Sequence, residues 1–306
     1  MQRQGRLAAA ALGAVAVVLL LAIVVSQASA VGAHAASNQK GKAGPLVVST
    51  KSFDLSVIDS VRYEVYCPRG TRPFGGGEFA TPVVDDKGTG IFPDSSERLG
   101  AQQGWHITVT ETAPASHHNV TLQAFCRKFK GNVQPVESEL GFDVRPGETK
   151  SATATCPGNK KIISGGFLTT GFRGGKGTFP GMYVTQSRMT SPRSWTVTAV
   201  GEPGGTGGQF NPIAYCFKSK KPLLTEKASA PVTVQGGVTA GGATATAVAP
   251  SCGRGKHGLA VGGYSGDTGL QFFDTYLNGS GAWSVSAIPF SRGGTFTAYA
   301  YCYAGK

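Results

Sequence analysis

A strict alternation of apolar and polar residues follows each of the three tryptophans in this chain. Segments 105–110, 195–200 and 283–288 each begin with Trp and place polar residues at their second and fourth positions and apolar residues at their third and fifth. A period of two predicts strands with one buried face and one solvent-facing face. On this basis His106, which follows Trp105, is expected on the solvent-facing side. No segment after residue 30 shows the 3.6-residue period of a capped helix, so the pattern predicts an all-β protein.

The same order of motifs occurs three times along the chain. Each copy has a cysteine, a Gly-Gly segment, the tryptophan and a closing Ala-aromatic-Cys, and the tryptophans are 90 and 88 residues apart. This period predicts three repeats, over residues 45–130, 137–221 and 229–306, here named repeats 1, 2 and 3. The tryptophans are expected in the repeat cores: Trp105, Trp195 and Trp283.

Repeat 2 gives the fullest prediction of strands. Strands are expected over 142–144, 150–156, 162–168, 183–189, 195–200 and 213–217, with turns of the Pro-Gly type between the early ones. Gly165 and Gly166 interrupt the third strand. Glycines inside a strand indicate a bulge or a close approach of another chain segment.

The repetition selects one disulfide pairing from the 15 that six cysteines allow. One bridge is expected inside each repeat: Cys67–Cys126, Cys156–Cys216 and Cys252–Cys302. Each would close a loop of 50 to 60 residues and stabilise the fold by about 4 kcal/mol on chain-entropy grounds. Metal ligation is disfavoured because the cysteines of a repeat are far apart and no Cys-x-x-Cys pair occurs.

Two arrangements of the repeats follow from these observations. Three tandem β-sandwich-like units are favoured, because each repeat has its own disulfide and tryptophan and because segments 127–137 and 218–231 resemble linkers. The alternative is a single pseudo-threefold, β-prism-like body to which each repeat gives one sheet.

The N-terminal segment has the composition of an export signal. Arg3 and Arg6 precede an apolar run over 7–25, and small residues that suit signal peptidase follow, so the mature chain is expected to begin near Val31 or Ala36. Residues 1–30 are therefore predicted to be a signal peptide, with an uncleaved membrane anchor as the alternative, since 19 apolar residues can span a bilayer. Residues 31–44 are expected to be a flexible tether. Export would expose the cysteines to an oxidising compartment.

Positive charge is concentrated in repeat 2. The chain carries a net charge of +12, which falls to +10 without residues 1–30, and residues 137–221 hold eleven basic against five acidic residues. A basic surface on an exported protein suits an anionic wall polymer, an acidic glycan or a lipid surface. Nucleic acid is not expected, because no aromatic residues are interleaved with the basic ones. The candidate binding residues are Lys160, Lys161, Lys218, Lys220 and Lys221.

No constellation of residues predicts catalysis, a metal site or a cofactor. Segment 172–178 resembles a phosphate-binding loop, but Gly177 follows its lysine where Ser or Thr is required. Asp85 and Asp86 lack calcium-binding spacing. The sequence predicts a secreted or cell-surface, non-enzymatic binding or structural protein. A secreted hydrolase that uses His117, His118 and the Asp85-Asp86 loop is the alternative.

The repeat resembles a module of uncharacterised secreted bacterial proteins. The module has the form Cys-Pro-x-Gly-Lys, Gly-Gly-Gly-aromatic, Trp-x-Val and Ala-aromatic-Cys. Repeat 2 matches it best, whereas repeat 1 has Arg69-Gly70 where Lys is usual and repeat 3 has Gly253 in place of Pro. The resemblance implies an extracellular, disulfide-bridged β unit and brings no catalytic residues.

Overall fold

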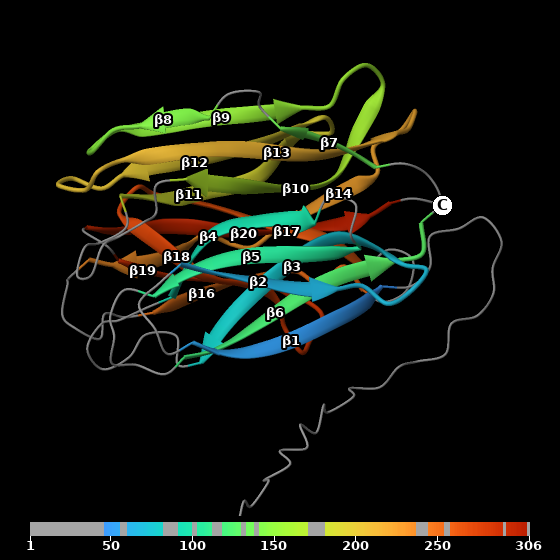
Figure 1. Ribbon diagram of the computed structural model, residues 1–306, viewed down its shortest axis with the longest axis horizontal. Helices are drawn as coiled ribbons and strands as arrows, with labels where there is room; N and C mark the ends of the chain where they lie inside the picture. The colour runs from blue at the N-terminus through green and yellow to red at the C-terminus, as the bar shows by residue number, and fades with distance from the viewer. Residues whose placement is uncertain are drawn as a thin grey trace, which may run out of the picture. The chain divides into compact units, whose positions relative to one another are not determined.

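The computed structural model describes residues 46–55, 60–81, 91–99, 103–111, 118–129, 133–137, 141–170, 181–236, 244–253, 258–289 and 292–304. These residues form twenty β-strands and no helix, which confirms the all-β prediction (Figure 1). All of these described residues belong to one compact unit. The predicted signal peptide and tether lie outside the described residues.

The first sheet is antiparallel and combines strands of repeats 1 and 3. Its order is β1-β6-β3-β18-β19-β16, and the junction between the repeats is the β3–β18 pair. The strands are β1 (Val47–Leu55), β6 (His118–Arg127), β3 (Arg72–Thr81), β18 (Leu270–Leu277), β19 (Trp283–Pro289) and β16 (Ala245–Ala249).

The second sheet is antiparallel and combines strands of repeats 1 and 2. Its order is β2-β5-β4-β10-β13-β7, with β8 also paired to β13, and the junction is β4–β10. The strands are β2 (Ser60–Tyr66), β5 (Gly104–Glu111), β4 (Ile91–Leu99), β10 (Lys160–Thr170), β13 (Gly208–Lys218), β7 (Gln134–Glu137) and β8 (Phe142–Val144).

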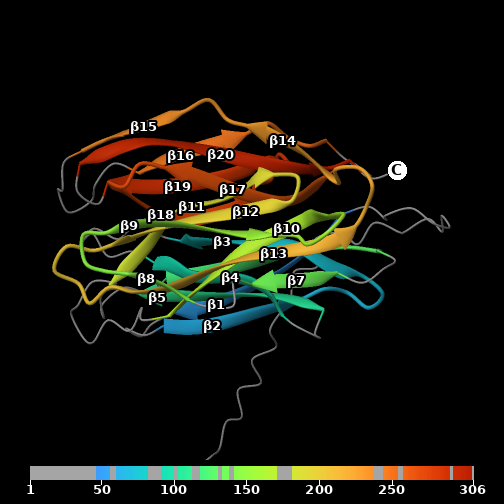
Figure 2. The ribbon, with the colours of Figure 1, turned by 90° about the horizontal axis from the view of Figure 1, so that it is seen from above.

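The third sheet is antiparallel and combines strands of repeats 2 and 3, and Figure 2 shows β17 and β20 (red) beside β11 and β12 (yellow). Its order is β14-β20-β17-β11-β12-β9, with β15 also paired to β20. The strands are β14 (Leu224–Ala228), β20 (Gly293–Tyr303), β17 (Leu259–Gly266), β11 (Met182–Ser191), β12 (Ser194–Gly201), β9 (Thr149–Thr155) and β15 (Val232–Gln235).

Every sheet is therefore shared by two repeats. Each repeat gives three or four strands to each of two different sheets, and no repeat has a complete sheet of its own, as separate tandem sandwiches would require. The sharing of sheets agrees with one body to which all three repeats contribute, but it differs from the alternative expectation that each repeat gives one sheet. Strands β7 and β14 lie within the segments predicted to be linkers. They pair with β13 and β20 respectively.

The three disulfides join the predicted pairs, with Cα–Cα distances of 5.6, 5.6 and 5.3 Å for Cys67–Cys126, Cys156–Cys216 and Cys252–Cys302. The first cysteine of each pair follows a strand of one sheet, and the second lies in a strand of another sheet. Each bridge therefore crosses the core between two sheets, and together the three bridges connect all three sheets.

The Gly-Gly and Trp motifs are explained by direct contact between them. The tryptophans are at most 2% exposed. A Cβ built on Gly76, Gly165 or Gly262 would come closer than 3.0 Å to the indole of the same repeat's tryptophan. Only a residue without a side chain leaves room for the ring at these positions.

The second glycine of each motif faces the adjacent repeat. A Cβ on Gly77, Gly166 or Gly263 would collide with a backbone carbonyl of the strand across the junction. These carbonyls belong to Thr275, Ser96 and Ser187 respectively. The glycine pair thus permits two close approaches at once, one to the indole and one to the neighbouring repeat.

The Ala-aromatic-Cys motif also connects the repeats. The hydroxyl of Tyr215 accepts a hydrogen bond from the backbone N–H of Arg98 (2.6 Å), and that of Tyr301 accepts one from Met189 (3.0 Å). Repeat 1 has Phe125 at this position, which carries no hydroxyl. There the side chain of Gln123 accepts from the N–H of Leu277 (2.8 Å) and donates to its carbonyl (3.0 Å).

The glycine–indole contact predicts the effect of adding one methyl group. Gly165→Ala should lower the free energy of unfolding by about 1–3 kcal/mol, because the methyl group overpacks the core against Trp195. Gly279→Ala is the control, since a Cβ there meets no atom within 4 Å. Urea unfolding of both variants measures the difference. Equal stability of Gly165→Ala and the parent protein would contradict the contact.

Candidate functional site

The structure places three of the five predicted lysines at one end of the β10–β13 pair, Lys160 and Lys218 on one face of the sheet and Lys161 on the other. Lys160 begins β10 and Lys218 ends β13, and the two are direct partners in the antiparallel register. Lys161 is the partner of Phe217, one position further along. Like charges directly opposite each other on a sheet are destabilising. The pairing of Lys160 with Lys218 is therefore kept despite an electrostatic cost.

Lys220 and Lys221 follow in the turn after β13, and both are exposed. The hydroxyl of Ser219 shapes this turn, since it donates to the carbonyl of Lys221 (2.7 Å) and accepts from its N–H (3.3 Å). Lys220 is only two residues beyond Lys218. We name Lys160, Lys161, Lys218, Lys220 and Lys221 the lysine cluster.

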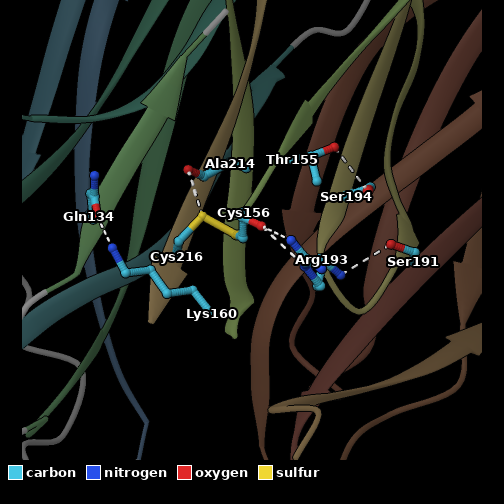
Figure 3. Close-up of a disulfide and its surroundings, with 9 residues drawn as sticks. All are labelled: Gln134, Thr155, Cys156, Lys160, Ser191, Arg193, Ser194, Ala214 and Cys216. Carbon is cyan, nitrogen blue, oxygen red and sulfur yellow. Dashed lines mark hydrogen bonds between the residues drawn. A yellow bond between two sulfur atoms is a disulfide. The ribbon is translucent and has the colours of Figure 1, made fainter. Parts of the chain in front are cut away.

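No carboxylate neutralises the lysine cluster within the described part of the chain. The ammonium of Lys160 donates to the neutral amide oxygen of Gln134 on β7 (Figure 3). The ion pairs found among the described residues are Arg62–Glu64 and His106–Glu97, and neither includes a cluster lysine. The positive charge of the cluster is thus available to an external anion.

A rigid support holds the lysine cluster. Cys156 and Cys216 are fully buried, and a turn from Pro157 to Lys160 connects β9 to β10. Figure 3 shows the guanidinium of Arg193 donating twice to the carbonyl of Cys156, at 2.7 and 3.1 Å. Sequence reasoning missed both Gln134 and Arg193, because neither belongs to a repeated motif.

Among the described residues, neither repeat 1 nor repeat 3 has two lysines at the positions equivalent to Lys160 and Lys218. Two residues beyond the second cysteine, repeat 1 has Lys128 and repeat 3 has Ala304. Repeat 1 has Thr71 at the position equivalent to Lys160, and it is buried. Arg127, which directly precedes Lys128, is fully buried, and its guanidinium donates to the carbonyl of Leu259 (3.2 Å). Its charge therefore serves the contact with repeat 3.

A Ser-His-Glu group in repeat 1 has the residue types of a hydrolase site but not the geometry. His106 is 3% exposed, which corrects the expectation that it faces solvent. Its Nε2 lies 3.1 Å from Glu97 Oε1 and 3.3 Å from Ser95 Oγ. A nitrogen that donates its proton to Glu97 cannot accept one from Ser95. Because both partners approach the same nitrogen, the group cannot relay a proton as a triad does.

The pKa of His106 agrees with a structural role. Burial, with a smaller contribution from the positive charge of Arg62, lowers it from 6.5 to about 4. The imidazole is thus neutral at pH 7 and donates a hydrogen bond to Glu97. Its Nδ1 is buried without a hydrogen-bond partner, so no group orients the ring from its second nitrogen, as a catalytic histidine requires.

The remaining candidate residues lie outside the described residues. These are Asp85, Asp86, His117, segment 172–178 and the side chain of His118. Within the described ranges no group of three or more His, Cys, Asp or Glu residues could hold a metal ion. No helix among these residues is long and apolar enough to cross a membrane.

The burial of His106 predicts its titration. In proton NMR spectra its imidazole signals should stay constant from pH 8 to 5 and shift with a midpoint near 4. Because the unfolded chain takes up this proton near pH 6.5, stability should fall as the pH drops below that value. His106→Gln assigns the signals by removing them. A midpoint near 6.5 would show that the ring is solvated.

In comparisons with known proteins, no family model matches this chain, and neither a curated protein nor a solved structure matches it. The lysine cluster is the candidate site that the charges and geometry of the chain itself support best.

Proposed function

We propose that this is an exported, non-enzymatic protein that attaches through the lysine cluster to an anionic polymer of the cell surface. One observation carries the proposal, the direct cross-strand pairing of Lys160 with Lys218 without a neutralising carboxylate among the described residues. An anion bound between the two ammonium groups would remove their repulsion. Binding and local stability would then increase together.

The strands and the disulfide that hold the lysine cluster favour an extended binding partner. Lys160 and Lys218 project from paired strands next to a disulfide, so two positive charges are held at a fixed spacing. Lys220 and Lys221 continue the positive charge along the following turn. A polymer with regularly spaced phosphate or carboxylate groups would contact several of these charges at once, and each contact adds to the overall affinity.

The disulfides and the N-terminal sequence support the compartment. Three disulfides without a free cysteine suggest an oxidising, extracellular environment. Residues 1–30 have the pattern of an export signal. Wall polymers, acidic glycans and anionic lipids are the abundant anionic partners there, and the extended display of charge favours a polymer.

Removing the cluster's charge should release the protein from wall fragments. We expect the variant with Lys160, Lys161 and Lys218 changed to Gln to bind at least tenfold more weakly at low salt in a sedimentation assay. Parent binding should also weaken as salt rises, because exposed charges are screened within about 8 Å at 0.15 M ionic strength. Stability should stay the same or rise slightly, because the substitutions remove the repulsion between Lys160 and Lys218. Adding Lys220→Gln and Lys221→Gln should weaken binding further.

A charge-matched variant is the control for this experiment. Changing Lys51, Arg145 and Arg292 to Gln removes the same charge from exposed positions outside the cluster and should leave binding nearly unchanged. Retention that ignores both salt and the cluster substitutions would reject the proposal. Equal loss in both variants would show that net charge, rather than the cluster, drives attachment. Binding to anionic vesicles but not to wall fragments would identify lipid as the partner.

A further inference from the structure

The junction between repeats 1 and 3 differs chemically from the other two junctions. It pairs β3 with β18 and connects the first and last repeats, whereas the others connect repeats that are consecutive in the chain. The residue after the Gly-Gly pair is aromatic in repeats 2 and 3, as Phe167 and Tyr264. In repeat 1 it is Glu78, which is only 2% exposed. A carboxyl group thus replaces a buried ring at this one junction.

The carboxyl of Glu78 is only half satisfied. Thr275 on β18 donates to its Oε1 (2.8 Å), while its Oε2 is buried without a hydrogen-bond partner. In the other junctions the equivalent hydroxyls, of Ser96 and Ser187, accept from the indole N–H of a tryptophan at 3.0 and 3.1 Å. At the β3–β18 junction the indole N–H of Trp283 has no such partner.

A second buried carboxyl lies at the same junction. Asp274 precedes Thr275 on β18 and is 4% exposed, and its Oδ1 accepts the backbone N–H of Ala80 across the junction (2.9 Å). On β19, Ser286 also hydrogen-bonds to Asp274. Glu78, Thr275 and Trp283 further line a small cavity of about 20 Å³ shared by all three repeats.

No described cation compensates the two carboxyls. The described ion pairs involve neither Glu78 nor Asp274. From β17, the titratable side chain that faces Glu78 is Tyr264. The side chains that lie close to the two carboxyls or to the cavity on β4, β5, β6, β10, β11 and β19 are uncharged. A buried carboxylate without a counter-charge is strongly disfavoured.

Both carboxyls therefore hold their protons to a higher pH than exposed carboxyls do. Burial, reinforced by repulsion from Asp274, raises the pKa of Glu78 well above its usual value. Burial raises the pKa of Asp274 to about 7. A raised folded pKa means that the stabilisation is complete below the unfolded value, about 4, and is lost as the pH rises through the folded value.

We propose that the β3–β18 junction is an alkali-sensitive latch: when Glu78 and Asp274 lose their protons, repeats 1 and 3 separate at this junction while the other two junctions hold. The latch is independent of the proposed attachment site, because the lysine cluster lies in repeat 2. Separation here would open the contact between the first and last repeats without breaking a disulfide, since each bridge lies within one repeat.

Amide hydrogen exchange of the full, oxidised protein tests the latch with an internal control. The backbone N–H of Leu277 bonds across the β3–β18 junction, and those of Arg98 and Met189 bond at the equivalent positions of the other junctions. As the pH rises from about 5 towards the folded pKa of each carboxyl, and after correction for the intrinsic exchange rate, the protection of Leu277 should fall by up to about tenfold per pH unit for each proton that opening releases, and it should level off above that pKa. The protection of Arg98 and Met189 should stay constant.

Isosteric amides complete the test. Glu78→Gln and Asp274→Asn, singly and together, imitate the protonated carboxyls and should keep Leu277 protected at pH 9, whereas the exposed Glu226→Gln should behave as the parent protein. An equal loss of protection at all three junctions would overturn the proposal. So would a loss at Leu277 that persists in the double variant, or failure of both single variants to fold at pH 5, where the carboxyls they imitate are neutral.

Discussion

The contact between an indole and a bare glycine backbone is the constraint on which the rest of this fold depends. It occurs three times, as Trp105 on Gly76, Trp195 on Gly165 and Trp283 on Gly262. The ring can lie this close because no Cβ intervenes, and the following glycine lets the adjacent repeat approach from the other side. The same dipeptide therefore fixes both the core of a repeat and its junction with the next.

The junctions show how one design tolerates local substitution. Two of them use a tyrosine hydroxyl to accept a backbone N–H of the neighbouring repeat, whereas the third has Phe125 and recovers the hydrogen bond through Gln123. The third junction also replaces an aromatic ring by Glu78 and leaves an indole N–H without a hydrogen-bond partner. This junction also contains the buried carboxyl groups of Glu78 and Asp274.

Local patterns predicted much of this structure, and long-range pairing was beyond them. Alternation after the tryptophans predicted the strands, and repetition predicted the disulfides, because both features are contained within one repeat. The sharing of sheets depends on contacts between repeats, such as Ser96 with Phe167, that no sequence period encodes. His106 was expected on a wet face, but Glu97 and Ser95 on the adjacent strand cover it. The lysine cluster was visible as charge, whereas the direct pairing of Lys160 with Lys218 required the register.

The central claim is that the repeats are not independent, because each sheet is completed by a neighbour. An isolated fragment of residues 134–221, which contains repeat 2 and the whole of β7, with its disulfide formed, tests this claim most directly. Its β10 and β11 would lose their partners β4 and β17, and Gly166 would lose its contact with the carbonyl of Ser96. The account predicts that urea unfolding of this fragment shows no cooperative transition, whereas the full chain unfolds cooperatively. A fragment that unfolds in one sharp transition, with Trp195 buried as in the full chain, would contradict it.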